Sequence, residues 1–181
     1  MSDDALYCRY LAGDHAAGDQ LMLRCGDALI AYLRGFLHNE QDAEDLMLDC
    51  FTVILVDKPR IAEGNFRAYL FRVARNKANR LWKLRLKRRE FSLDESLIAQ
   101  GSAPEEKAIE NERGAAVRAC MGRIAPQYRE ALWLIHEMGM NYAQAAQILG
   151  CSVKKIDNLL MNGKKQLRLE LEKEGITGAE R

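Results

Sequence analysis

Proline is scarce in this sequence of 181 residues, which has only Pro59, Pro104 and Pro126. The alternation of β-branched and polar residues that predicts a β-strand is nearly absent as well. Helices can therefore run for long stretches between the prolines, because a proline inside a helix kinks or breaks it. The sequence predicts an all-α fold.

Clusters of metal ligands and long apolar runs are also missing. The five cysteines are scattered without a C-x-x-C pair, and the three histidines add no group of ligands. This spacing predicts neither a disulfide framework nor a zinc site. We therefore expect no metal, no cofactor, and cysteines that are mostly small buried residues in a reducing cytosol. Neither a signal peptide nor an apolar run of membrane-spanning length is found, so we expect a soluble intracellular protein without membrane insertion.

The net charge is close to zero, yet the charges are strongly segregated. Lys and Arg number 27 against 26 Asp and Glu. Between Met1 and Cys50, however, ten acidic residues face only three arginines, whereas residues 66–89 hold ten Lys and Arg and no acidic residue. A cationic run on a helical segment repels itself unless it meets a polyanion, and this predicts a nucleic-acid surface.

Residues 66–89 predict a helix that packs on the body of the protein through an apolar stripe including Leu70, Ala74 and Ala78. Aromatic residues lie among its cations, which suits unpaired bases because rings stack on bases while Arg and Lys follow the phosphates. The alternative is that Phe66, Tyr69 and Phe71 are core residues and the cations a solvated face. The candidates for single-stranded DNA, two of them from the preceding loop of residues 58–65, are Arg60, Asn65, Phe66, Tyr69, Arg72, Arg75, Asn76, Asn79, Arg80 and Lys83.

An acidic helix is expected before this loop, capped by Asn39 and stopped by Pro59. Apolar residues recur in it at helical spacing, and Asp42, Asp45 and Asp49 lie on its other side. Three carboxylates on one helix face are by default an ordinary solvated surface. Beside a cationic helix in the same domain, they also suggest a basic protein partner.

A change in composition after Arg89 divides the chain. Residues 91–107 mix Ser, Gly, Pro and acidic residues with little periodicity, which predicts a flexible linker. We therefore expect two small helical domains, residues 1–90 and 108–181, joined by this linker.

The second domain contains a helix-turn-helix pattern. Asn141 and Gln144 predict a capping box before a short helix that ends at Gly150, and Ser152 caps the next helix, in which Val153 is expected to help seal the pair. The second helix of such a pair enters the major groove of duplex DNA with its N-terminal residues. The candidates for duplex DNA are Ser152, Lys154, Lys155, Asp157 and Asn158, with Lys164 and Lys165 either on the DNA backbone or solvated.

Three segments carry a family resemblance: DAEDLMLDCF at 42–51, FRAYLFRVARNKANR at 66–80, and the helix-turn-helix within 132–168. In this order they make the chain resemble an extracytoplasmic-function sigma factor, the small two-domain class of the bacterial sigma-70 family. The first domain is similar to region 2 of that family and the second to region 4. The sequence departs from the family pattern at Leu48 and Tyr69, where Gln and Trp are common.

The resemblance implies a role for each domain. Region 2 would open the −10 element of a promoter, hold a flipped base near the loop 58–65, and bind the clamp helices of the β′ subunit. The matching positions for polymerase binding are Asp42, Glu44, Asp45, Leu48 and Asp49. Region 4 would read the −35 element as duplex and touch the β-subunit flap. The implied partners are core RNA polymerase, promoter DNA and an anti-sigma factor, in the bacterial cytoplasm.

Two other classes of function compete with this hypothesis. A plain two-domain DNA-binding regulator would share the helix-turn-helix but would need neither the acidic helix nor aromatics among the cations. An enzyme acting on nucleic acid would need paired carboxylates, a phosphate-binding Gly-rich loop or a nucleophile beside a base, and the sequence presents none of these patterns. We therefore expect a sigma factor that is not an enzyme.

Overall fold

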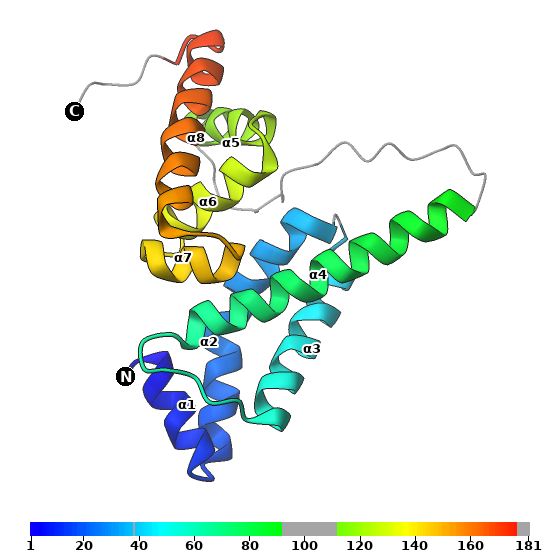
Figure 1. Cartoon of the computed structure of the whole chain (residues 1–181), viewed down its shortest axis with the longest axis vertical. Helices are drawn as coiled ribbons and strands as arrows, with labels where there is room; N and C mark the ends of the chain where they lie inside the picture. Colours follow the sequence, from blue (N-terminus) through cyan, green and yellow to red (C-terminus); the bar gives the residue numbers. More distant parts are fainter. Residues whose placement is uncertain (38, 92–111, 177–181) are drawn as a thin grey trace. The chain divides into compact units, whose positions relative to one another are not determined.

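The structure is a computed structural model that describes residues 1–37, 39–91 and 112–176. In these ranges every regular element is an α-helix, and eight helices follow one another along the chain (Figure 1). The all-α prediction is confirmed. The chain divides into two compact units, Met1–Gln100 and Gly101–Arg181. The predicted linker lies outside the described residues apart from Phe91, so its flexibility and the domain limits at 90 and 108 stay predictions.

Four helices form the first unit. They are α1 (Asp3–Leu11), α2 (His15–Leu37), α3 (Glu40–Asp57) and α4 (Phe66–Phe91). Side-chain caps start two of them: Ser2 Oγ accepts a hydrogen bond from Ala5 N–H at 3.2 Å, and Asn39 Oδ1, the predicted cap, accepts one from Gln41 N–H at 3.0 Å. α2 contacts each of the other three helices, so the core of this unit lies around α2.

The N-terminal half of α4 belongs to that core. The side chains on its inner face have no exposed surface, and they are Phe66, Leu70, Phe71, Ala74 and Ala78. Farther along, Trp82 and Leu84 are half exposed, and Figure 1 shows the last turns of α4 extending past α2 and α3. The helix is thus anchored in the first unit through its first half, while its second half is largely open to solvent.

The second unit consists of α5 (Glu112–Arg123), α6 (Pro126–His136), α7 (Tyr142–Leu149) and α8 (Val153–Lys173), and α8 contacts the other three. The predicted capping box is confirmed, since Asn141 and Gln144 exchange hydrogen bonds of 2.9 and 3.0 Å. The turn between α7 and α8 passes through Gly150, which has φ 65°. These features confirm the predicted helix-turn-helix.

One residue of the predicted helix-turn-helix seal is corrected by the structure. Val153 is 48% exposed, whereas Ile156 and Leu160 are buried. α8 begins at Val153, and buried side chains on this helix start about one turn later, at Ile156. Val153 therefore does not help to seal the pair.

Most of the cysteines are buried, as predicted. Cys25, Cys50 and Cys120 are buried, Cys151 is partly buried and Cys8 is exposed. Burial raises the pKa of the Cys25 thiol to about 11 and the pKa of the Cys50 thiol to about 12. Both groups are therefore protonated at neutral pH, and a protonated thiol is a poor nucleophile.

Gly163 allows close packing between α8 and α6. A Cβ atom added at Gly163 would lie 3.1 Å from Tyr128 Cβ and 3.1 Å from Leu132 Cδ1. We expect Gly163→Ala to destabilise the second unit by about 1 kcal/mol or more, because overpacking outweighs the gain in helix propensity. The control is Gly122→Ala in α5, where nothing lies within 4 Å of the added Cβ. Thermal unfolding measures both variants, and an equal Tm for the two would contradict the close contact.

Candidate nucleic-acid and protein interfaces

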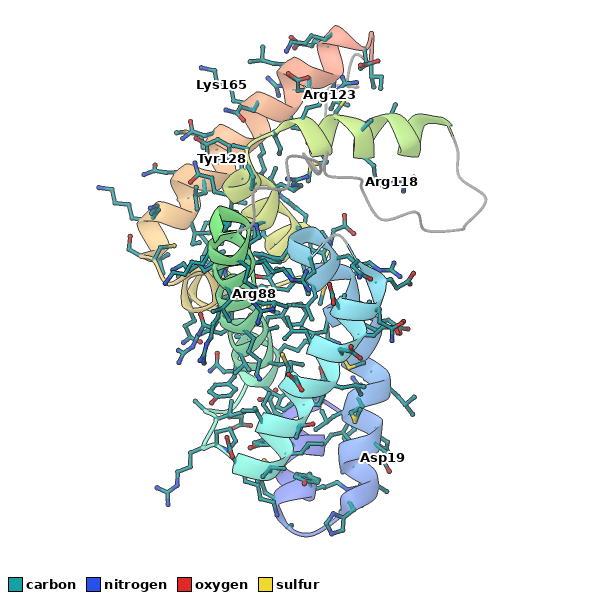
Figure 2. The ribbon with its side chains drawn as sticks, turned by 90° about the vertical axis from the view of Figure 1, so that its right-hand side faces the viewer. Asp19, Arg88, Arg118, Arg123, Tyr128 and Lys165 are labelled. Carbon is teal, nitrogen blue, oxygen red and sulfur yellow. The ribbon has the colours of Figure 1, made fainter. Side chains whose placement is uncertain are left out.

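The cationic side of α4 is open to solvent, opposite the buried stripe. The exposed or partly exposed candidates on it are Tyr69, Arg72, Arg75, Asn76, Asn79, Arg80 and Lys83. Figure 2 shows the side chains along this helix, with Arg88 labelled in its second half. The structure therefore brings the predicted cations and amides of α4 onto an accessible surface of the first unit.

Tyr69 and Arg72 form an aromatic–cation pair near the start of α4. The Arg72 guanidinium carbon lies 5.9 Å from the centroid of the Tyr69 ring, within the range of a cation–π interaction. Tyr69 N–H donates a hydrogen bond to Asn65 O at 2.9 Å, which fixes the backbone of this residue in the first turn. The pair offers a partly exposed ring beside a positive charge, the two features that single-stranded DNA binds.

Phe66 is a core residue, and the prediction that it contacts DNA is wrong for this structure. Its side chain has 0% exposed surface, and its ring centroid lies 5.1 Å from that of Tyr7. Phe71 is buried in the same way, with its ring 5.2 Å from that of Tyr32. A ring without exposed surface cannot stack on a base, so of the predicted stacking residues Phe66 and Tyr69 only Tyr69 is accessible.

The loop of residues 58–65 presents Arg60, Ala62 and Glu63 to solvent. Asn65 closes its second half, because its N–H donates to Ala62 O at 3.1 Å and its Nδ2 donates to Glu63 O at 3.2 Å. Arg60 is thus an accessible cation in the loop, while the amide of Asn65 is already used to shape the loop.

The acidic face of α3 has two parts. Glu44, Asp45 and Leu48 are exposed. Asp42, which is partly buried, and Asp49, which is exposed, also reach cations of α4, with Asp42 Oδ2 2.6 Å from Arg85 Nη2 and Asp49 Oδ2 3.9 Å from Lys77 Nζ. Part of the predicted polymerase surface is therefore paired with two cations of α4, Arg85 and Lys77, that are not among the candidates for single-stranded DNA.

These pairs were not foreseen from the sequence, because Asp42 and Arg85 are 43 residues apart and on different helices. The opposite charges of α3 and α4 indicated in the sequence that the two helices could pair, but they did not indicate which residues would meet. The sequence also gave no sign that α1 contacts the loop 58–65, which the structure shows through the 2.8 Å hydrogen bond from the Tyr7 hydroxyl to Pro59 O.

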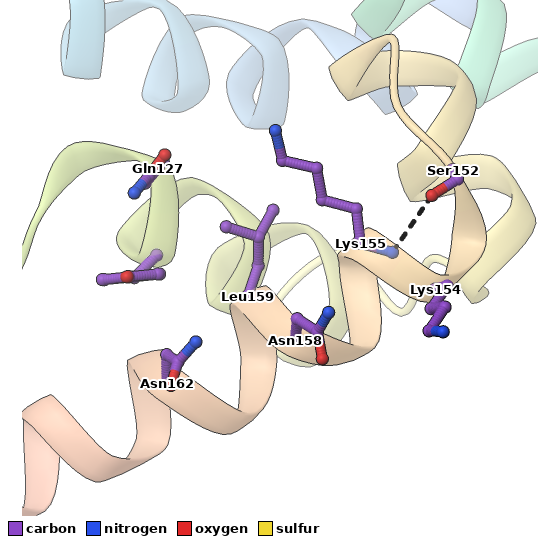
Figure 3. A pocket seen from close by; sticks show the side chains of 8 residues that line it. Gln127, Ser152, Lys154, Lys155, Asn158, Leu159 and Asn162 are labelled. Carbon is purple, nitrogen blue, oxygen red and sulfur yellow. Dashed lines mark hydrogen bonds between the residues drawn. The ribbon is translucent and has the colours of Figure 1, made fainter.

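In the second unit, the first turn of α8 carries the predicted duplex-binding residues. Ser152 Oγ accepts a hydrogen bond from Lys155 N–H at 3.3 Å and so starts the helix. The other predicted candidates on α8 are all exposed, and they are Lys154, Lys155, Asp157, Asn158, Lys164 and Lys165. Figure 3 shows Lys154 and Lys155 leaving the first turn in different directions.

A hollow of about 490 Å³ lies beside this turn, between α8 and the start of α6. Gln127 and Tyr128 of α6 line it together with Ser152, Lys154 and Lys155 (Figure 3). Gln127 and Tyr128 were not among the predicted candidates, because nothing in their spacing indicated that the start of α6 lies beside the helix-turn-helix.

Candidate metal sites and membrane-spanning helices were sought among the described residues. In these ranges no group of three or more His, Cys, Asp or Glu side chains could hold a metal ion. No helix among them combines the length and the apolar character that crossing a membrane requires.

Family comparisons match both units. The family model for Sigma-70 region 2 matches residues 21–89, and the model for Sigma-70, region 4 matches residues 114–167. The first match contains α3, the loop 58–65 and most of α4, and the second contains the helix-turn-helix. Together the two models of one family cover more than half of the chain.

Individual relatives agree with these matches. The chain is 29% identical over 182 residues to the RNA polymerase sigma factor CnrH of Cupriavidus metallidurans, covering 92% of each protein. It is 25% identical to the ECF RNA polymerase sigma factor SigE of Mycolicibacterium smegmatis, covering 86% of this chain and 63% of SigE. The structure of CnrH in complex with the cytosolic domain of CnrY is similar with a TM-score of 0.66 and 27% identity, covering 94% of this chain and 97% of that one.

The different burial of Phe66 and Tyr69 predicts different effects on stability. We expect Phe66→Ala to lower the free energy of unfolding of the first unit by about 3–5 kcal/mol, because it leaves a cavity in the core. Tyr69→Ala removes a partly exposed ring and is expected to cost about 1 kcal/mol. Urea unfolding of the two variants measures the difference, and losses of the same size would contradict the assignment of Phe66 to the core.

Proposed function

This chain belongs to the sigma-70 family as an extracytoplasmic-function sigma factor that directs RNA polymerase to promoters, and on that premise we propose a role for each of its open surfaces. The observation that carries the proposal is the two-sided character of α4. Its inner face is fully buried from Phe66 to Ala78, and its outer face holds an accessible ring among cations. The protein acts by binding, with no covalent chemistry of its own.

The outer face of α4 and the loop 58–65 bind the opened strand of the −10 element. Tyr69 stacks on an unpaired base beside the charge of Arg72, and the accessible cations farther along the helix follow the phosphates. Arg60 and Asn65 lie next to the flipped base at the loop. Opening is driven by the capture of unstacked bases, and Phe66 supports this surface from the core.

The exposed part of the α3 face binds the β′ clamp helices of core RNA polymerase. Glu44 and Asp45 supply charge, and the half-exposed Leu48 supplies an apolar contact among the carboxylates. Asp42 and Asp49 join the same surface when polymerase binds, because they then exchange Arg85 and Lys77 of α4 for cations of the polymerase. Surface ion pairs are worth about 0–1 kcal/mol, so this exchange is inexpensive.

The second unit reads the −35 element as duplex DNA. The first turn of α8 enters the major groove with Ser152, Lys154, Lys155, Asp157 and Asn158, while Lys164 and Lys165 follow the DNA backbone. The same unit touches the β-subunit flap. This role rests on the exposure of these side chains at the start of α8 and on the match to Sigma-70, region 4.

An anti-sigma factor holds the protein inactive in the bacterial cytoplasm. The similar structure of CnrH contains the cytosolic domain of CnrY, and that complex supports a protein partner of this kind for the present chain.

Transcription in vitro tests the proposed function. Purified protein is added to core RNA polymerase with a library of promoters, and we expect run-off transcripts from a subset that shares −10 and −35 sequences. Binding to duplex DNA without binding to polymerase, and without promoter-specific transcripts, would overturn the proposal in favour of a plain DNA-binding regulator.

The charges of the recognition helix predict a specific salt dependence. Lys154→Ala or Lys155→Ala should weaken binding of the −35 duplex and reduce the slope of log K against log salt by about one unit for each lost phosphate contact. The matched control is Lys173→Ala at the other end of α8, where the ammonium pairs with Glu170 and the slope should not change. An unchanged slope for the Lys154 and Lys155 variants would remove these residues from the DNA interface.

The ring of Tyr69 predicts a defect in promoter opening. Because stacking of one base on an aromatic ring is worth about 1–3 kcal/mol, Tyr69→Ala should reduce opening by about tenfold or more. Tyr69→Trp keeps a stacking face and serves as the control. Fluorescence of a base analogue in the −10 strand reports opening, and normal opening by the Ala variant would exclude stacking on Tyr69.

A further inference from the structure

The first end of the loop 58–65 is bonded to α1. The Tyr10 hydroxyl donates a hydrogen bond to Leu55 O at 2.9 Å, in the last turn of α3, and the Tyr7 hydroxyl donates one to Pro59 O at 2.8 Å. Lys58 Nζ also lies 5.3 Å from the centroid of the Tyr10 ring. Two tyrosines of α1 therefore hold the chain where it leaves α3 and enters the loop.

The second end of the loop is bonded to the same helix. Asp4 Oδ1 accepts a hydrogen bond from Phe66 N–H at 3.1 Å, so a carboxylate of α1 caps the start of α4. One residue later, Arg67 Nε lies 2.6 Å from Asp3 Oδ2. The ring of Phe66 also packs on Tyr7, the residue that bonds Pro59 at the other end of the loop.

α1 is itself held in place by buried contacts with the rest of the first unit, so it can hold the ends of the loop in fixed positions. Leu6 is fully buried, and Asp3 is only 8% exposed, with Arg24 Nε of α2 2.9 Å from its Oδ1. At Gly18 of α2, an added Cβ would lie 2.9 Å from Tyr10 Cδ2, so the absence of a side chain there leaves room for the tyrosine ring.

Between its two anchors the loop turns sharply and is accessible. Lys58 has φ 44° and Gly64 has φ 78°, and Arg60, Ala62 and Glu63 between them are exposed. Asn65 shapes only the second half of the loop, through its bonds to Ala62 and Glu63. In the first half, the Tyr7 hydroxyl bonds the backbone at Pro59 O and the Tyr10 ring lies against the Lys58 side chain.

We propose that Asp4, Tyr7 and Tyr10 are positioning residues, which hold the loop 58–65 in the shape that discriminates between −10 sequences. The inference rests on the proposed function of that loop. These side chains act through the backbone of the loop and of α4, and they do not touch DNA. α1 is therefore part of promoter selection, although it precedes the residues that match Sigma-70 region 2.

Hydroxyl deletions test this proposal while keeping both rings and their packing. The double variant Tyr7→Phe, Tyr10→Phe is assembled with core RNA polymerase, and opening is measured on a preferred promoter and on the same promoter with one −10 base changed. A typical hydrogen bond changes an equilibrium by about two- to tenfold, so we expect the ratio between the two promoters to fall by about that factor. Affinity for core polymerase and for the −35 duplex should stay unchanged.

A cap deletion provides a second, matched test. Asp4→Ala removes the cap of α4, and we expect it to reduce −10 discrimination, whereas Asp4→Asn retains an acceptor oxygen and should restore most of it. The control is Ser2→Ala, which removes the cap of α1 itself, where Ser2 Oγ accepts from Ala5 N–H, without touching the loop. Ser2→Ala should leave the discrimination ratio at its original value.

The outcomes separate this inference from the proposed function. If the unaltered protein does not open promoters with core polymerase, the proposed function fails and the inference fails with it. If the unaltered protein discriminates and the double variant has the same ratio with only a lower Tm, the proposed function stands and α1 has a merely structural role. A lower ratio in the double variant and in Asp4→Ala, but not in Ser2→Ala, supports the positioning role.

Discussion

Burial of the inner face of α4 is the constraint on which the first unit depends. Residues 66–89 contain ten cations and no acidic residue, and such a segment repels itself. Each fully buried Phe or Leu contributes about 1.5–3 kcal/mol of transfer free energy, and Phe66, Leu70 and Phe71 are all fully buried. This burial also fixes the rotation of α4 about its axis. Once the inner face is buried, the helical period determines which side chains of α4 lie on the opposite, exposed face, where DNA could reach them.

The remaining charges of the first unit fall into two kinds. Asp3 is buried and paired with the partly exposed Arg24 and Arg67, so these contacts give a buried carboxylate its ionic partners and help to hold α1 in position. The pairs of Asp42 and Asp49 with α4 are on the surface and contribute little to stability. Weak pairs of this kind exchange readily for another ionic partner, and the proposed polymerase and DNA contacts require such an exchange.

The corrected residues show where reasoning from periodicity fails. An aromatic residue at the start of a basic helix looks the same in sequence whether its ring is exposed or buried. Phe66 is buried because the ring of Tyr7, 59 positions earlier in the sequence, packs on it, and Tyr69 is accessible three positions later. Val153 has the right spacing for the helix pair, yet it stands at the first position of α8, ahead of the buried residues of that helix.

Helix type, most helix ends and the segregation of charge were determined by the sequence alone, because they depend on local features: the caps Ser2, Asn39 and Ser152, the capping box at Asn141, and the scarcity of proline. The order of the motifs was also sufficient to indicate the family. Tertiary structure decided which rings are accessible and which carboxylates of α3 meet α4. It also decided that α1 bonds both ends of the loop 58–65. These are contacts between residues far apart in the chain, and no local pattern encodes which distant partner a side chain will meet.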